Sequence, residues 1–375
     1  MACISRALIV GGGVAGLSAA IALSRQGVHC EVVELHGKPD GASMALSGRA
    51  AEALFELGVY EQSCVTGRIF AADSTAAALY AADGQLLRPS PRRPEWPGSK
   101  DGVAVFRPAF AQILEDTASS LCTLRKGVTI TAIDDSGDSA QVTFSDGETR
   151  AFDLVIGADG IHSLTRKLVF PEIGEPEYSG QISIRWMVPG PAIEGEGWYT
   201  SDVGKVGFYY LPHQQLTYVP AVLTVPERRW MSSADVYGLF TRLLDSISAK
   251  PIKQLQERLK PVSQLIGRPF NWILVPGQWH RGRTLLIGDA AHATTAHLGM
   301  GAGMALEDAV VLSQCIASEA SLPQALEAFM RRRFERVKTV VESSVKLSQL
   351  EQRKAPPSEN GAVMMGALTA ISQPY

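Results

Sequence analysis

The first apolar segment of the chain changes its periodicity at a cluster of glycines. Residues 7–10, ALIV, are continuously apolar and predict a buried strand. The sequence GGGVAG follows directly, and residues 17–27 then have the small and apolar positions of a helix that ends at Gly27. Residues 29–35, HCEVVEL, predict a second strand. The order of strand, glycine turn, helix and strand predicts a βαβ unit with parallel strands.

Two later segments repeat this order. The apolar residues 152–158 predict a strand, the Asp-Gly pair after it predicts a turn, and Ser163 is placed to cap the helix that follows. Residues 283–288 predict a third strand, and a glycine-rich loop then leads into a helix that extends to about residue 317. Between these units, the alternation and the Asp-Gly turn of residues 140–152 predict a β-hairpin.

The middle of the chain has a different pattern. Residues 178–189, 205–212 and 215–226 alternate apolar or aromatic with polar positions, which predicts the strands of an antiparallel sheet. We therefore expect an α/β unit assembled from residues 1–70, 101–177 and 278–350, and a second unit from residues 71–100 and 178–277. Residues 351–375 are expected to form a C-terminal tail after the last helices. Four prolines in residues 88–102 predict a surface loop between the two units.

Composition narrows the class of protein. The chain has 375 residues, of which 46% are hydrophobic and 19% are charged, as in a globular protein with a large core. The net charge of -3 argues against a nucleic-acid partner. The five cysteines include no CxxC pair, which favours reduced thiols and a cytoplasmic location. Residues 7–23 are apolar, but glycines interrupt them and they are too short to predict a membrane span.

The first glycine cluster has the spacing of a dinucleotide site. Gly11, Gly13 and Gly16 fit the pattern G-x-G-x-x-G, in which the glycines permit a tight turn, approach of a pyrophosphate, and close packing of helix on strand. The phosphates would lie at the positive end of the helix, next to Val14 and Ala15. Glu34, at the end of the second strand, is placed to accept hydrogen bonds from a ribose. An acid there disfavours a 2′-phosphate, so the nucleotide is expected to be FAD or NAD.

The stretch GDAAHATTAHLGMGAGMALEDA, residues 288–309, allows two interpretations. Asp289, His292 and His297 suggest a metal site, but the sequence lacks HxxxH spacing and a nearby cysteine, so we expect no metal. The second interpretation is a flat cofactor: Asp289 would accept a hydrogen bond from a ribityl hydroxyl. The loop from Gly299 through Met300 and Gly301 to Ala302 would then bring backbone NH groups close to a flavin ring at a helix N-terminus.

Together these three motifs resemble the single-component FAD-dependent aromatic hydroxylases, the para-hydroxybenzoate hydroxylase-like group. The pattern D-x-x-x-G-A-D-G-x-x-S-x-x-R is complete from Asp153 to Arg166, and G-D-A-A-H begins at Gly288. The resemblance implies a Rossmann-like FAD-binding domain of the glutathione-reductase type, an antiparallel β-sheet substrate domain and C-terminal helices. It also implies that Arg107 reaches the flavin side of the cofactor, and that Asp159 takes part in FAD and NAD(P)H handling.

The chain departs from the family pattern at four positions. Ala296 stands where the family usually has proline, and Met300 where it usually has glutamine. Leu35 replaces a common arginine, and Arg49 a common asparagine. The first two positions lie beside the expected reaction centre, so they bear on the substrate more than on the cofactor.

The resemblance implies a monooxygenase that uses NADH or NADPH and O2 to hydroxylate a small aromatic or heteroaromatic substrate through a flavin C4a-hydroperoxide. A single nucleotide motif disfavours the disulfide reductases, which need a second one. The alternatives are a flavin-dependent halogenase, an oxidase or reductase without oxygen insertion, and a flavin-binding sensor. The protein is expected to be a monomer or a homodimer without a membrane span.

Candidate catalytic residues are those that could orient or ionise a phenolic or acidic substrate. His297, beside Ala296, is the first candidate for a polar group near the flavin, and Arg185 and Tyr210 on the expected substrate strands are the next. Tyr209, His213 and Tyr218 lie in the same segments. His292 is expected to be structural and bonded to backbone.

Overall fold

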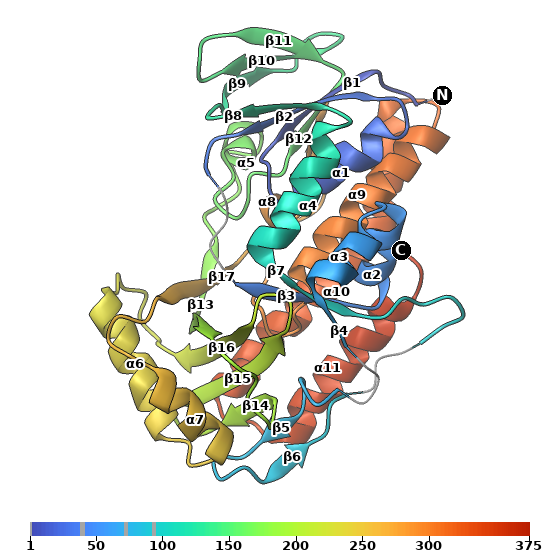
Figure 1. The fold of residues 1–375 in the computed structure, drawn as a ribbon. Coiled ribbons are helices and arrows are strands. Elements are labelled where there is room, and N and C mark those ends of the chain that lie inside the picture. Colours follow the sequence, from blue (N-terminus) through green and yellow to red (C-terminus); the bar gives the residue numbers. More distant parts are fainter. Residues whose placement is uncertain (1, 38–41, 71–73, 92–94) are drawn as a thin grey trace.

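The computed structural model describes residues 2–37, 42–70, 74–91 and 95–375. Two sheets form opposite ends of the molecule, and helices from the C-terminal part of the chain run alongside both (Figure 1). Part of the predicted loop 88–102, namely residues 92–94, lies outside the described residues.

A six-stranded sheet forms the first end. Its strand order is β18-β19-β12-β1-β2-β8, and every neighbouring pair is parallel except β18 with β19. The βαβ prediction is therefore confirmed, with β1 at the centre of the sheet. The strands are β1 (Arg6–Val10), β2 (His29–Glu34), β8 (Thr123–Lys126), β12 (Leu154–Gly157), β18 (His280–Arg281) and β19 (Thr284–Leu286).

The two faces of this sheet are covered differently. Ala7 and Ile9 pack into the core formed with helices α1 (Val14–Ser24), α4 (Arg107–Ser119) and α9 (Gly301–Ser318). Leu8 and Val10, which alternate with them, pack against the small sheet β9-β10-β11. The strands of that sheet are β9 (Ile130–Asp134), β10 (Ala140–Phe144) and β11 (Thr149–Phe152), and the antiparallel pairing of β10 with β11 confirms the predicted hairpin.

A seven-stranded sheet forms the second end, in the order β17-β13-β16-β15-β14-β5-β6. Its outer face packs on helices α6 (Ser233–Asp245) and α7 (Lys250–Arg258) through a separate apolar core. The pairs β13 with β16 and β15 with β16 are antiparallel, as the alternation predicted. The strands are β5 (Leu79–Tyr80), β6 (Leu86–Arg88), β13 (Glu177–Pro189), β14 (Gly197–Thr200), β15 (Gly204–Leu211), β16 (Leu216–Thr224) and β17 (Leu265–Trp272).

A third, three-stranded sheet in the order β3-β7-β4 lies between the two ends (Figure 1). Helices α2 and α3 pack near it, and α5 follows β12, where Ser163 caps it as predicted by accepting from the backbone NH of Arg166. The elements are β3 (Ser43–Leu46), β4 (Arg68–Ile69), β7 (Val103–Phe106), α2 (Arg49–Glu56), α3 (Tyr60–Thr66) and α5 (Leu164–Val169).

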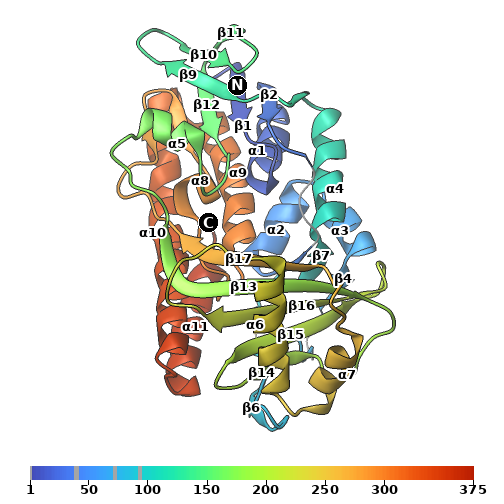
Figure 2. The same cartoon turned by 90° about the vertical axis from the view of Figure 1, so that its left-hand side faces the viewer.

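The chain ends in two long helices. Helix α10 (Leu322–Gln352) packs on α9 at the first end and on β13 at the second, so it links the two halves (Figure 2). Residues 351–375, which were expected to form a tail, include helix α11 (Pro357–Ser372), which packs back on α10. In the described part of the chain, none of the helices has the length and apolar character needed to cross a membrane.

Candidate active site

The carboxyl ends of three parallel strands bring the sequence motifs to one edge of the six-stranded sheet. Gly11 follows β1, Asp159 follows β12, and Gly288 follows β19. Ligands of open α/β sheets bind at this edge, because helix N-termini and turns gather there. A four-residue helix, α8 (Asp289–His292), begins at Gly288, where the sequence predicted only a loop.

The three glycines of the first motif lie in different surroundings. A Cβ atom on Gly11 would lie 2.4 Å from the carbonyl oxygen of Ala158, and one on Gly16 would lie 1.9 Å from that of Gly11. A Cβ on Gly13 would meet no atom within 4 Å. Gly13 begins α1 without a side-chain cap, so the first NH groups of the helix face open space. This turn leaves room for an anion at the helix N-terminus.

Glu34 lies at the end of β2, next to the glycine turn. Its Oε2 atom accepts a hydrogen bond of 2.6 Å from the backbone NH of Gly12, and Oε1 accepts one from His36. The carboxylate thus fixes the turn, and its free lone pairs are the acceptors that a ribose would use.

A large cavity runs from this edge to the seven-stranded sheet. It has a volume of about 2460 Å³, whereas pockets for one drug-sized ligand span about 300–1,000 Å³. It is lined by Gly13, Val14 and Ala15 at one end and by residues of β13, β15 and β16 at the other. The cavity therefore has room for a dinucleotide together with a second ligand.

Asp289 and Arg107 lie in the wall of this cavity. The side chain of Asp289 opens into the cavity, and its surroundings raise its pKa through burial, an effect that His292 and Arg107 oppose. No hydrogen bond of the Asp289 carboxylate to another described residue is found. An acceptor held open at a strand end matches a ligand that carries hydroxyl groups.

The side chains of Asp159 and Arg166, from the middle motif, form hydrogen bonds with other groups of the protein. The carboxylate of Asp159 accepts hydrogen bonds from the hydroxyls of Ser163 and Thr165 and from the backbone NH of Thr165, at 2.5–3.0 Å. Arg166 is buried and donates to the carbonyl oxygens of Ile161 and Ala290. This motif locks α5 to the turn at α8, and only its backbone neighbours Ala158 and Gly160 line the cavity.

His292 is structural, but not in the way the sequence suggested. Its Nε2 atom lies 2.6 Å from the carboxylate of Asp308 and not against backbone, so that expectation was wrong. Asp308 also accepts from the NH of Gly288 at 3.0 Å and from Arg333 at 2.8 Å. Asp308 is buried, and although burial acts to raise its pKa, His292 and Arg333 lower that pKa to about 2.

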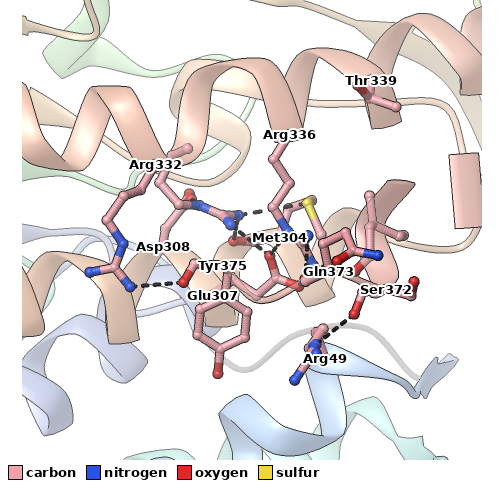
Figure 3. A network of polar contacts seen from close by, with 12 residues as sticks. Arg49, Met304, Glu307, Asp308, Arg332, Arg336, Thr339, Ser372, Gln373 and Tyr375 are labelled. Carbon is pink, nitrogen blue, oxygen red and sulfur yellow. Dashed lines mark hydrogen bonds and ion pairs between the residues drawn. The ribbon is translucent and has the colours of Figure 1, made fainter. Parts of the chain in front are cut away.

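The buried ion pairs continue to the end of the chain (Figure 3). Arg333 and Arg336 of α10 both bind Glu307 of α9, at 2.6 and 2.7 Å. Arg336 also donates to the carbonyl of Gln373, and Arg332 donates to that of Tyr375. Among the described residues, no group of three or more possible ligands for a metal is found, and Asp289, His292 and His297 serve separate purposes.

The inner face of the seven-stranded sheet supplies the far wall of the cavity. Strand alternation turns Ser183 and Arg185 of β13 and Tyr209 of β15 toward the cavity, and turns Ile184 and Phe208 into the outer core. Arg185 has no hydrogen-bond or ion-pair partner within the described part of the chain.

Two tyrosines lie on the same face as Arg185, Tyr218 on the neighbouring strand β16 and Tyr209 on the next strand, β15. Tyr209 pairs with Tyr218 across β15 and β16, with ring centroids 5.4 Å apart, and its hydroxyl donates to Ser43. Burial raises the pKa of Tyr218, and the charges of Arg185 and Arg107 oppose this.

The structure places Tyr210 differently from its neighbour. Tyr210 lies on the same face of β15 as Val206 and Phe208, which belong to the outer core. It does not line the cavity. Its backbone NH donates to Glu196, and its carbonyl accepts from Arg68. Tyr209, which was not among the first catalytic candidates, is the tyrosine of β15 that faces the cavity.

His297 lines the cavity together with two charged residues that the sequence did not indicate. Its Nδ1 atom lies 3.0 Å from the hydroxyl of Thr295, and its Nε2 atom lies 3.2 Å from Glu351 of α10. Glu351 also forms an ion pair with Lys205 of β15. Glu351 was missed because it lies 54 positions further along the chain, in residues expected to be a tail.

The glycine-rich loop leads into α9 as predicted. Gly299, at a φ of 67°, Gly301 and Ala302 line the cavity, and α9 begins after Met300 without a side-chain cap. Met300 itself is 7% exposed and packs in the core, away from the lining of the large cavity. The positive end of α9 thus points into the cavity.

The chain is similar in sequence and fold to known proteins. A family model described as "FAD binding domain" matches residues 5–344. The "2-heptyl-3-hydroxy-4(1H)-quinolone synthase" of Pseudomonas aeruginosa is 32% identical, over 93% of this chain and 90% of that protein. The "Aurachin C monooxygenase/isomerase" of Stigmatella aurantiaca is 31% identical, over 92% of this chain and 89% of that protein. Klebsiella pneumoniae HpxO complexed with FAD and uric acid has a similar fold, with a TM-score of 0.82, 21% identity, and coverage of 99% of this chain and 97% of that one.

These findings define the class of protein as FAD-dependent monooxygenases. The chain belongs to the FAD binding domain family, and it is an FAD-dependent monooxygenase of the para-hydroxybenzoate hydroxylase-like group. The predicted fold class, family and cofactor are confirmed. The similarity to monooxygenases therefore favours this function over the three alternatives, namely a halogenase, an oxidase or reductase, and a flavin-binding sensor.

Proposed function

We propose that this monooxygenase inserts one atom of O2 into a bicyclic, nitrogen-containing heteroaromatic ring that carries a ring carbonyl. NADH or NADPH is the electron donor, and the second oxygen atom leaves as water. The observation that carries the proposal is the unpaired Arg185 on the cavity wall, on the strand next to the one that carries Tyr218. A guanidinium in that position orients a carbonyl or enolate oxygen.

The cofactor fits the end of the cavity at the six-stranded sheet. Gly13 and the NH groups that begin α1 would hold the pyrophosphate, Glu34 the ribose, and Asp289 the ribityl chain. Gly299, Gly301 and Ala302 would lie against the ring system, with Arg107 on the same side. When bound, FAD supplies the two-electron chemistry that activates O2. Asp159 stabilises the turn before α5 through Ser163 and Thr165, and its part in cofactor handling stays a prediction.

The substrate class is supported from two directions. The 32% identical relative is named for a quinolone product, and the Klebsiella enzymes at 27% identity are named urate hydroxylases. In this chain the polar side chains of the sheet face the cavity, and it is also lined by apolar side chains of β5, β6 and α11, namely Leu79, Leu87, Met364 and Leu368. The polar wall suits the ring oxygen and nitrogen, and the apolar wall suits an aliphatic substituent.

The protein's own residues bind, orient and shield the substrate. Aromatic side chains of Phe70, Tyr209 and Phe270 enclose the polar wall, which limits water at the ring. Hydrogen bonding from Arg185 to a ring oxygen holds the ring in one orientation, so that a single carbon is presented to the cofactor end of the cavity.

The test is a coupled turnover assay with purified holoenzyme, NADH or NADPH, and labelled O2. The panel contains 2-heptyl-4(1H)-quinolone, 2-methyl-4(1H)-quinolone, urate and salicylate, and mass spectrometry measures label in the product. We expect labelled product from a quinolone or from urate, and a higher ratio of product to reduced cofactor consumed than with salicylate. Consumption that yields only hydrogen peroxide with both quinolones and with urate would refute the substrate class.

The variant Arg185→Met tests whether Arg185 binds the substrate. It should raise KM for the carbonyl-bearing ring by roughly tenfold or more, because a charge-assisted hydrogen bond contributes about 1.5–3 kcal/mol. Arg258→Met is the matched control, since Arg258 donates to the carbonyl of Pro191 at the outer face of the sheet. Equal KM values in the two variants would remove Arg185 from the substrate site.

A further inference from the structure

Arg88, the last residue of β6, is a cation in the cavity wall without an acidic partner. Its Nη1 atom donates to the sulfur of Met364 on α11 at 3.6 Å, and a thioether is a weak acceptor. Its Nε atom is buried without a hydrogen-bond partner, and no ion pair joins Arg88 to a carboxylate in the part of the chain that the structure describes. A guanidinium carries about five N–H donors, so most of those of Arg88 have no partner in the protein.

Two further polar side chains lack partners beside Arg88, and with it they form the β6–α11 corner. Asn360 lines the cavity four residues before Met364 on α11, so it lies on the same helix face, one turn from the contact with Arg88. Ser90 follows Arg88 by two residues and also lines the cavity. The amide oxygen of Asn360 and the hydroxyl of Ser90 are buried without a hydrogen bond to any described residue. Buried polar groups are almost always paired, so this corner indicates a place for a polar ligand group.

The charge of the β6–α11 corner is positive. Glu351 of α10 is the carboxylate that acts on Arg88, and it opposes the effect of burial, which lowers the pKa of Arg88. Glu351 is already bound to the ammonium of Lys205, and Lys354 is paired with Asp202. These three cations and two carboxylates leave one positive charge in excess. A guanidinium stays charged at neutral pH, so the corner favours an anion.

The beginning of α11 adds to this charge. Ala355 and Pro357 line the cavity, and α11 begins at Pro357 without a side-chain cap. The acid of its first turn, Glu359, is exposed and pairs with Arg353. The NH groups of the first turn of a helix carry partial positive charge, which stabilises an anion nearby. The guanidinium, the amide and the helix end therefore favour the same kind of ligand group, an anion with several acceptor atoms.

An apolar strip joins this corner to the cofactor end of the cavity. Asn360, Met364 and Leu368 recur at every fourth residue and line the cavity from one face of α11. Leu368 also lies with Met300 around a small pocket, and Met300 belongs to the glycine-rich loop before α9. The strip therefore runs from the glycine-rich loop to Asn360. A ligand whose ring lies against that loop would extend an aliphatic chain along Leu368 and Met364 toward Arg88.

We propose that the β6–α11 corner binds a carboxylate at the end of an aliphatic substituent on the substrate ring. Arg88 and the amide NH2 of Asn360 donate to the carboxylate oxygens, and the methylene groups lie on Met364 and Leu368. Arg185 then holds the ring and Arg88 holds the substituent, which fixes the substrate at two points. The corner makes and breaks no covalent bond, so it acts on affinity and orientation. The proposal rests on the proposed function, because it specifies the substituent of that heteroaromatic substrate.

The test measures binding without turnover. The probes are 2-(4-carboxybutyl)-4(1H)-quinolone and its methyl ester, which share one ring and one chain length. Each is titrated into oxidised holoenzyme, and the change in flavin absorbance gives the Kd. We expect the acid to bind the wild-type enzyme roughly tenfold or more tightly than the ester, because hydrogen bonds to charged groups are the stronger ones.

Variants separate this corner from the general charge of the cavity. Arg88→Met keeps the length of the side chain and should make the two Kd values about equal, by weakening the acid roughly tenfold. Arg88→Lys keeps the charge and should retain part of the preference, and Asn360→Leu should weaken the acid and leave the ester unchanged. Arg242→Met is the matched control, because Arg242 lines the cavity from α6, and it should keep the wild-type preference. FAD occupancy and the urea midpoint check that each variant is folded.

Equal Kd values for acid and ester with the wild-type enzyme would overturn the proposal, as would equal losses in Arg88→Met and Arg242→Met. If Arg88→Met instead raises the KM of NADPH or NADH and keeps the acid preference, the corner binds a phosphate of the electron donor and the substrate assignment is wrong. Failure of the proposed substrate class is a different result. In that case neither quinolone changes the flavin spectrum, yet calorimetry shows that octanoate, and not octanamide, binds to the wild-type enzyme and not to Arg88→Met.

Discussion

Replacing Gly13 and replacing Gly16 with alanine should have opposite consequences, although the two glycines belong to one motif. Gly13 has a φ of -81° and a ψ of -170°, which is extended backbone that alanine adopts. Its Cβ would enter open space, whereas a Cβ on Gly16 would lie 1.9 Å from the carbonyl oxygen of Gly11. The methyl group of Gly13→Ala would therefore clash with a bound ligand, whereas the methyl group of Gly16→Ala would clash with the protein backbone.

The magnitudes can be worked from these surroundings. At an N-cap, alanine is less favourable than glycine by about 0.5–1 kcal/mol, and the lower entropy of the unfolded alanine chain offsets this by about 0.4–1 kcal/mol. Gly13→Ala should thus leave the unfolding free energy of the apoprotein almost unchanged. Displacing the pyrophosphate from one charge-assisted NH contact costs about 1.5–3 kcal/mol, which raises the Kd of FAD roughly 10- to 150-fold. Gly16→Ala should instead destabilise the apoprotein by about 1–3 kcal/mol or more.

The assay is urea unfolding of the two apoproteins and of wild type, followed by titration with FAD monitored by quenching of flavin fluorescence. Wild-type FAD affinity in Gly13→Ala would refute the placement of the pyrophosphate at this turn. Equal loss of apoprotein stability in the two variants would refute the reasoning about the two Cβ positions.

Three further outcomes concern Asp289, which opens into the cavity, and Asp308, which is buried. Asp289→Asn should raise the Kd of FAD about tenfold through loss of a charged acceptor, while the apoprotein unfolds at the same urea concentration as wild type; a lower midpoint would indicate a structural role. Asp308→Asn should lower the unfolding free energy by about 3–5 kcal/mol, measured by urea unfolding, because it leaves Arg333 without one of its two buried carboxylates. The folded-state pKa of Asp308, about 2, lies below its unfolded value, so its contribution is complete above about pH 4 and disappears as the pH falls through 2. Acid unfolding of the wild type should therefore show a loss in that window that is missing in Asp308→Asn.

The cofactor end of the site was predictable from sequence because its information is local. The glycine turn, the helix after it and Glu34 lie within 24 residues of one another, and each step has a steric or hydrogen-bonding reason that spacing alone reveals. The alternation of residues 178–226 likewise predicted which sheet forms. It did not decide which of Tyr209 and Tyr210 faces the cavity, because strand parity depends on register against β16.

Contacts between distant segments were not predictable in the same way. His292 meets Asp308 because the fold places α9 beside α8. In the sequence, this contact was indicated only by an acidic residue in an apolar stretch of a predicted helix. Glu351 has no local feature that separates it from the other charged residues of a long amphipathic helix. The position of Glu351 in the cavity wall depends on how α10 runs from one sheet to the other.

The ion pairs of α10 account for how Glu351 reaches the cavity. Arg333 is fully buried between Glu307 and Asp308, and Glu351 lies 18 residues further along the same helix. At a rise of about 1.5 Å per residue, that distance is about 27 Å. A slip of α10 by one residue would rotate its side chains by about 100° and would separate the buried charge of Arg333 from Glu307 and Asp308. Because that penalty is several kcal/mol, the network at the cofactor end fixes the register of the helix. The same register turns Leu347 and Glu351 toward the substrate wall, so the buried charges that stabilise α8 also determine which side chains α10 presents to the cavity.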